Sequence, residues 1–171
     1  ADNEVCFDIE PNTNNNPGFD YFTKYVNVLD CFDIYAEQNI SDEKVLHAAA
    51  VAAELLDNDE NGIPDNAKVL DALIKHKATL VMFKSYGSMK YKKFFHSSKW
   101  PDGQKTDKRA VQDLYDDETH PNGAADGIFD ASLEEVLHLI TFGGYSNAYP
   151  EIFGTKRGTA VSKAVDIARG G

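Results

Sequence analysis

The chain has 171 residues, a length that fits one domain with a substantial buried core. Lys and Arg number 17 and Asp and Glu number 28, so the net charge of −11 argues against DNA or RNA as a partner and favours cations. No apolar run approaches the roughly 20 residues that cross a bilayer, so we expect no membrane span.

The first part of the chain predicts an arm, a strand region and a helix. Residues 1–22 are expected to form an irregular N-terminal arm, because positions 7–20 are rich in Asn, Pro and Gly. Residues 23–36 are rich in β-branched and aromatic residues with partial alternation, which predicts one or two strands. Ser41 is expected to cap an Ala-rich helix over residues 42–56.

The second part of the chain adds three helices and a strand. Residues 66–76 predict a helix, and the apolar stretch 79–83 predicts a short buried strand. Residues 85–130 predict turns, and their pattern does not distinguish helix from strand. A further helix is expected over residues 132–142, ended by Gly143-Gly144 as a glycine C-cap, and a last one over 158–169. These elements predict a single α+β domain.

Residues 57–65, Asp-Asn-Asp-Glu-Asn-Gly-Ile-Pro-Asp, have the spacing of a calcium loop. Gly62 permits the sharp turn. The expected ligands are the side chains of Asp57, Asp59, Asn61 and Asp65 and the carbonyl of Ile63. The Glu that closes an EF-hand is replaced by Lys68, so the loop resembles the shorter repeats of dockerins and thrombospondin type 3 modules. The alternative is an Asn/Asp-rich turn that binds no metal.

Three features predict a secreted protein. The chain opens at Ala1 rather than at Met, and Asn39-Ile40-Ser41 is a glycosylation sequon. A loop without its closing Glu is expected to bind calcium with a dissociation constant of about 10⁻⁴ to 10⁻³ M, which extracellular calcium would fill. Cys6 and Cys31 allow one disulfide that would hold the N-terminal arm, or else two buried thiols.

The segment Glu134-Glu135-Val136-Leu137-His138 carries the candidate chemistry. Residues four apart share a helix face, so Glu134 and His138 are expected to bind zinc, with Glu135 as the general base. The surrounding apolar residues predict burial on most sides. The alternative is structural: a Glu134–His138 salt bridge, with Ser132 and Glu135 forming a capping box.

A catalytic zinc needs a third protein ligand. The candidates are the carboxylates of Asp166 and Glu151 and the imidazoles of His120 and His47. Tyr145 and Tyr149 follow the helix, where a hydroxyl could donate a hydrogen bond to an oxyanion, or the rings could simply pack.

Several segments together resemble a family of secreted, poorly characterised proteins from marine organisms. They are residues 45–50 (VLHAAA), 56–62 (LDNDENG), 79–83 (TLVMF), 134–141 (EEVLHLIT) and 164–171 (AVDIARGG). The resemblance covers about residues 25–171 and implies a chain that continues further or is processed from a precursor, which would supply a second chain as partner. Residues 134–138 alone are similar to the zinc peptidases, with Glu134 in place of a ligand His. This similarity implies zincin-like helices with a small sheet.

Two functions are therefore expected. The first is a secreted, calcium-stabilised, zincin-like metallohydrolase that acts on a protein or peptide. The second is a non-catalytic extracellular calcium-binding or interaction protein that retains the zincin-like scaffold. An acid hydrolase using Glu134 and Glu135 as a pair is disfavoured, because adjacent helix positions diverge.

Overall fold

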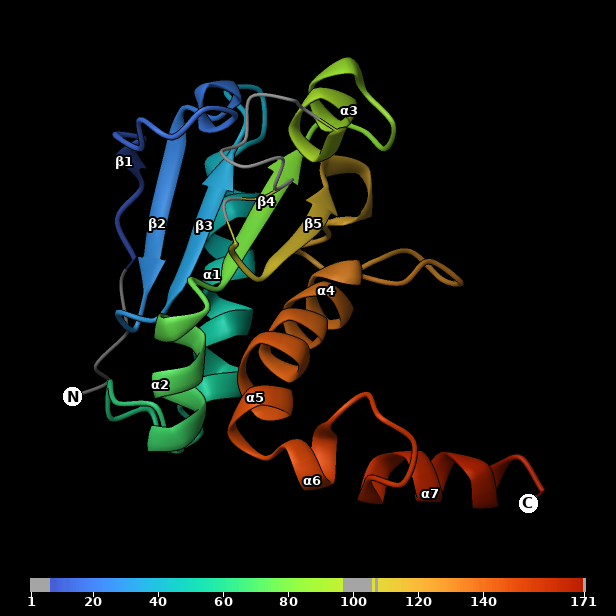
Figure 1. Cartoon of the computed structure of the whole chain (residues 1–171). Coiled ribbons are helices and arrows are strands. Elements are labelled where there is room, and N and C mark those ends of the chain that lie inside the picture. Colours follow the sequence, from blue (N-terminus) through green and yellow to red (C-terminus); the bar gives the residue numbers. More distant parts are fainter. Residues whose placement is uncertain (1–6, 97–105, 107, 171) are drawn as a thin grey trace.

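One mixed β-sheet organises the molecule. The structure, a computed structural model, describes residues 7–96, 106 and 108–170 (Figure 1). Within these residues the strands are β1 (Glu10–Pro11), β2 (Lys24–Val28), β3 (Phe32–Ala36), β4 (Thr79–Phe83) and β5 (Val111–Tyr115). Their spatial order is β1-β2-β3-β4-β5. The first three pair antiparallel, whereas β3–β4 and β4–β5 are parallel.

Helices occupy the connections and the C-terminal part. They are α1 (Asp42–Leu56), α2 (Ala67–Lys75), α3 (Met89–His96), α4 (Ala131–Leu139), α5 (Ser146–Ala148), α6 (Pro150–Phe153) and α7 (Ala160–Ala168). The predicted α+β class is confirmed, as are the helices expected near 42–56, 66–76 and 158–169 and the strand at 79–83. In the described part of the chain no helix is long and apolar enough to cross a membrane.

The sheet is buried on both faces. Leu80 and Met82 of β4 face a core that also contains the buried residues of α1, α2 and α4. Val81 and Phe83 face the opposite way, into an aromatic cluster with Phe19 and others from the N-terminal segment and α3. A central parallel strand covered on both sides is expected to be apolar throughout, which is why β4 shows no alternation.

The Ala-rich sequence of α1 lets this helix lie close to the sheet. Val45, Ala48, Ala49, Ala52 and Leu56 recur at helical spacing and are all buried. Ser41 occupies the cap position but its side chain makes no capping hydrogen bond. Figure 1 shows α1 behind the strands, whereas α6 and α7 lead away from the sheet.

The N-terminal segment is more regular than the sequence predicted, and the central segment contains elements that the sequence pattern left undecided. The described part of the expected irregular arm contains β1 and a 3₁₀ turn at Phe19–Tyr21, and Phe19 is fully buried. The segment 85–130, whose pattern left helix and strand undecided, provides α3, β5 and a 3₁₀ turn at Asp116–Glu118.

The predicted helix end at Gly143-Gly144 is wrong. The chain continues from α4 into a π-helical stretch at Ile140–Tyr145, and both glycines are buried inside it. A Cβ on Gly144 would lie 2.8 Å from Val69 Cγ1 and 3.3 Å from Leu73 Cδ2, both on α2. The absence of side chains at this point therefore allows a close approach between two helices rather than a stop.

Candidate functional site

The loop between α1 and α2 is folded around Asp57. This residue is only 3% exposed, and its carboxylate accepts backbone hydrogen bonds from Asn61 (3.2 Å) and Gly62 (2.7 Å). Gly62 has φ +85° with open space around its Cβ position, so the glycine is required by backbone conformation alone. The amide of Asp65 donates to the carbonyl of Leu56 at 2.8 Å and closes the loop.

Three of the predicted calcium ligands converge. One carboxylate oxygen each from Asp57, Asp59 and Asp65 lies within 4.8 Å of the other two. Hydrogen bonds from the side chain and backbone of Asn58 lower the pKa of Asp65 below its usual value. Ionised carboxylates at this distance repel one another unless a cation lies between them, so the donor set fits a hard divalent ion.

The other two predicted ligands belong to the same turn. The Asn61 side-chain oxygen accepts a hydrogen bond from the Ile63 amide at 2.9 Å. The side chain of Ile63 is 65% exposed, so only its backbone is available for a role in the loop. A cavity of about 40 Å³ separates the loop from Tyr145.

Glu134, Glu135 and His138 meet on one face of α4. His138 Nε2 lies 3.8 Å from Glu134 Oε1, and His138 Nδ1 lies 3.4 Å from Glu135 Oε2. One ligand atom from each of the three lies within 4.8 Å of the others. All three residues come from the same helix, so they can coordinate a metal ion from one side only.

This face is exposed, which corrects the predicted burial of the helix. The side chains of Glu134 and His138 are 51% and 55% exposed, and Leu133 and Leu137 are exposed as well. The predicted burial on most sides is wrong, and the Glu134–His138 ion pair of the structural alternative is present but exposed. An exposed pair four residues apart contributes little to stability.

The predicted capping box at Ser132 and Glu135 is also wrong. The N-cap of α4 is Asp130, whose Oδ1 accepts hydrogen bonds from the Ser132 amide (3.2 Å) and hydroxyl (2.8 Å). Glu135 instead accepts a hydrogen bond from the Gln112 side chain on β5. The carboxylate of Glu135 is thus held beside His138 by a neighbouring strand.

The surroundings of Glu135 favour its protonated form. Partial burial raises the pKa of Glu135, and the charges of Asp113 and Glu134 add to the effect, while His138 acts against it. Burial together with Glu135 and other acids also raises the pKa of Glu118. A carboxyl group with a raised pKa is a candidate for proton transfer. Gln112, Asp113 and Glu118 were missed from the sequence, although the acidic run 116–118 that follows β5 was a signal.

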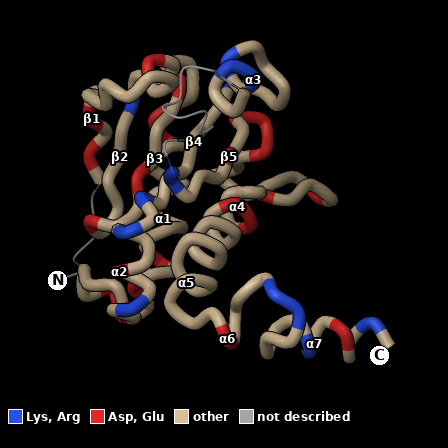
Figure 2. Tube along the Cα trace, in the orientation of Figure 1, with Lys and Arg blue, Asp and Glu red and all other residues tan. Residues whose placement is uncertain are grey.

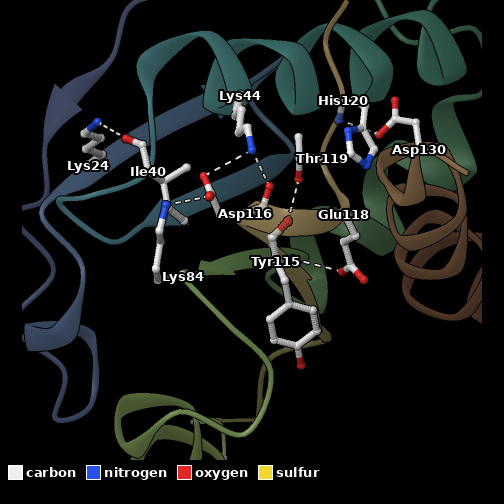
Figure 3. A network of polar contacts seen from close by, with 10 residues as sticks. All are labelled: Lys24, Ile40, Lys44, Lys84, Tyr115, Asp116, Glu118, Thr119, His120 and Asp130. Atoms are coloured by element: carbon white, nitrogen blue, oxygen red, sulfur yellow. Dashed lines mark hydrogen bonds and ion pairs between the residues drawn. The ribbon is translucent and has the colours of Figure 1, made fainter. Parts of the chain in front are cut away.

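Two of the residues predicted as a possible third zinc ligand, His47 and His120, contact Asp130 instead of lying near His138. His47 Nε2 lies 2.7 Å from Asp130 Oδ2. The His120 amide donates to Asp130 Oδ1 at 3.1 Å, and Figure 3 shows these two residues side by side. His120 Nε2 is buried and has no hydrogen-bond partner in the described part of the chain. Neither imidazole joins the group on α4.

The remaining predicted site residues lie elsewhere. Glu151 and Asp166 are exposed on α6 and α7, and neither joins the ligand group on α4 within the described residues. Tyr145 packs against the main core and lies 5.1 Å from the ring of Phe153. The Tyr149 hydroxyl lies 3.2 Å from the Asn66 side chain at the start of α2. These contacts favour the packing role for both tyrosines.

The asparagine of the predicted sequon is exposed, and one of the two cysteines is buried. Asn39 is exposed in the turn before α1. Cys31 is buried, and burial raises the pKa of its thiol to about 12. Its expected partner Cys6 lies outside the described residues, so the disulfide stays a prediction.

The comparisons with known proteins found no relative of the chain. No protein-family model, no curated protein and no solved structure matches the chain. The resemblance to secreted marine proteins therefore stays a prediction, and the two clusters of ligand atoms are the features of the structure that bear on function.

Proposed function

We propose that the protein is a calcium-stabilised extracellular protein in which the ion binds Asp57, Asp59 and Asp65. The observation that carries the proposal is the convergence of these three carboxylates within 4.8 Å on a loop already closed around Asp57. The ion acts on structure: it holds the angle between α1 and α2, which connect β3 to β4. This matches the non-catalytic alternative, an interaction protein that needs calcium to keep its shape.

The experiment is thermal unfolding after chelation, with calcium or magnesium added back. At ten times a dissociation constant of about 1 mM, calcium stabilises by about 1.4 kcal/mol. For a chain of this size that free energy raises the Tm by roughly 3–5 °C. Magnesium at the same concentration is expected to do less, because it prefers a tighter octahedral shell.

Asp59→Ala is the decisive variant for the loop. Asp59 is exposed and accepts no hydrogen bond from any described residue, so its removal leaves the turn intact while removing a ligand. We expect the calcium-dependent rise in Tm to disappear. Asp71→Ala, an exposed acid on α2 outside the cluster, is the matched control and keeps the rise. An equal calcium response in both variants would contradict the proposal.

A second candidate function is a zincin-like metallohydrolase acting on peptides, favoured by the ligand group on α4. Glu134 and His138 would hold a zinc ion, and Glu135, with its raised pKa, would take a proton from water. The exposure of this face supports the candidate, because a substrate can reach it. The lack of a third ligand from another described element counts against it and ranks it second.

Elemental analysis of protein purified without added metal tests this candidate. Zinc near one per chain that is lost in Glu134→Ala and kept in Glu151→Ala supports it. Because the Glu134–His138 pair is exposed, Glu134→Ala is expected to change the free energy of unfolding by no more than about 0.5 kcal/mol. Folded wild-type protein with no zinc and no peptidase activity after zinc addition excludes it.

A further inference from the structure

A second pocket lies on the opposite face of the sheet from α1. It has a volume of about 270 Å³ and is lined by Asn12, Thr13, Asn14, Tyr25, Tyr35 and Arg109. Tyr25 and Tyr35 are neighbours on β2 and β3, with ring centroids 5.0 Å apart. The volume falls just below the 300–1,000 Å³ of typical ligand sites, so the pocket suits a solute of monosaccharide size.

Arg109 is the unusual residue in this pocket. Its side chain is 9% exposed, and its guanidinium lies 5.0 Å from the centre of the Phe19 ring. One terminal nitrogen donates to Thr79 Oγ1 at 3.3 Å and lies 3.6 Å from Asp33 Oδ2. The Nε–H is buried and has no hydrogen-bond partner among the described residues. A buried donor left without an acceptor is costly, and Arg109 lines the pocket, so a ligand oxygen that reached this group would relieve the cost.

The other unused groups in the pocket are donors as well. The Tyr35 hydroxyl accepts a hydrogen bond from Asn14 at 3.2 Å, which leaves its own proton to donate. Burial raises the pKa of Tyr35, so the hydroxyl keeps that proton. Thr13 adds an exposed hydroxyl at the rim. A ligand that satisfies these groups must bring acceptor oxygens.

Asp33 limits how much negative charge the pocket accepts. Its Oδ1 accepts hydrogen bonds from Tyr25 (2.8 Å) and Asn27 (3.1 Å), and its Oδ2 faces Arg109. The pair of Arg109 and Asp33 has little net charge. Any anion at the guanidinium meets repulsion from Asp33, and this repulsion is about twice as large for a doubly charged phosphate as for a single carboxylate, so the pocket favours the carboxylate.

We propose that this pocket binds a small hydroxylated monocarboxylate of the hexuronate type. Arg109 binds the carboxylate, the Tyr35 and Thr13 hydroxyls donate to ligand oxygens, and the two tyrosine rings lie against the sugar ring. This inference does not depend on calcium or zinc.

Ligand-observed NMR on the wild-type chain is the first test, with D-glucuronate and D-glucose as a matched pair. The two sugars differ by a carboxylate in place of a hydroxymethyl group. We expect glucuronate to bind at least about tenfold more tightly than glucose, and glucose 6-phosphate to bind more weakly than glucuronate. Equal binding of glucuronate and glucose, or no binding of glucuronate, overturns the proposal.

Two substitutions assign the binding to this pocket. Arg109→Lys keeps a positive charge but removes the Nε–H, and Tyr35→Phe removes only a hydroxyl. Each is expected to weaken glucuronate binding about fivefold or more, while Tyr86→Phe, an exposed tyrosine outside the pocket, leaves it unchanged. Near-ultraviolet circular dichroism checks folding. Wild-type affinity in both folded pocket variants means that glucuronate binds elsewhere, and the proposal is then wrong.

Discussion

Asp130 joins three separate parts of the chain around α4. It caps this helix through Ser132, pairs with His47 of α1 and accepts the amide of His120. Partial burial alone would raise the pKa of Asp130, but the hydrogen bonds from His47, from Ser132 and from the backbone outweigh it and hold the pKa below its usual value. Two predicted zinc ligands therefore have a structural partner.

Replacing Asp130 should destabilise the protein. Asp130→Ala removes the helix cap and leaves His47 without its carboxylate, so we expect a loss of about 1–2 kcal/mol in the free energy of unfolding. Urea unfolding at pH 7 measures the loss. Asp126→Ala, an exposed acid nearby, should change the value by less than about 0.5 kcal/mol. Similar stability of the two variants would contradict the role given to Asp130.

Gly144 offers a second test at the scale of one residue. Gly144→Ala places a methyl group 2.8 Å from Val69 Cγ1 and is expected to cost about 1–3 kcal/mol. Val69→Ala removes that obstructing atom. In a double-mutant cycle the Gly144→Ala substitution should therefore cost less in the Val69→Ala background. Additive losses would show that the close approach does not limit this position.

At the scale of elements, α1, α2 and β4 could be predicted because each has its signal within its own sequence. The spacing of Val45, Ala48 and Ala52 defines the buried face of α1 without reference to any neighbour. By contrast, α3 buries only Phe94 fully, and β5 carries Gln112 and Asp113 where a strand would be expected to be apolar. Such elements are stabilised by contacts with the sheet and the aromatic cluster. These contacts form between distant parts of the chain, so a local sequence pattern does not reveal them.

The candidate sites also differ in how far the local sequence predicts them. Three of the predicted calcium ligands converge because they lie within nine residues of one loop, so their spacing was sufficient to predict the cluster of carboxylates. The surroundings of Glu135 depend on Gln112 of a different strand, and the cap of α4 depends on Asp130 rather than on Ser132. Gly143 and Gly144 could be interpreted in two ways from the sequence, because glycine is favoured both at the end of a helix and where two helices lie close together.

The last helix, α7, is expected to be dispensable for the fold. It has no buried residue, and its main packing partner is the short α6. Figure 2 shows Lys and Arg between α6 and α7 and along α7, and Lys156 and Arg157 in this connection are exposed. Brief trypsin treatment should cleave there first and leave a core whose Tm is within about 2 °C of the intact chain. Unfolding of the trimmed core would show that α7 contributes to stability.

For the molecule as a whole, ion pairs at the ends of the parallel strands predict a loss of stability in acid. Asp116 follows β5 and pairs with Lys44 of α1 and with Lys84 after β4 (Figure 3). Partial burial would raise the pKa of Asp116, but the two lysines outweigh it and hold the pKa below the usual 3.8. The unfolded chain then binds the proton more tightly than the folded one.

The sign of the pH effect follows from this difference. The stability from Asp116 and Asp130 is fully present above pH 3.8 and is lost as the pH falls through their depressed folded values. Glu118 and Glu135 act in the opposite sense, because their raised pKa values make the folded state bind protons first as the pH falls toward 4.5. Urea midpoints should therefore change little between pH 7 and 5 and fall steeply below pH 4. Asp116→Asn should flatten that fall, and an unchanged slope would contradict the assignment.

The parallel pairing of β3 with β4 also has a consequence for the order of folding. The two strands can meet only after the chain has passed through α1, the loop at residues 57–65 and α2. Closing so long a connection before its helices form would be entropically expensive, and pairing between distant segments slows folding. We expect the helical hairpin of α1 and α2 to form early and to deliver β4 to β3, so that the turn between the helices controls the refolding rate more than the unfolding rate.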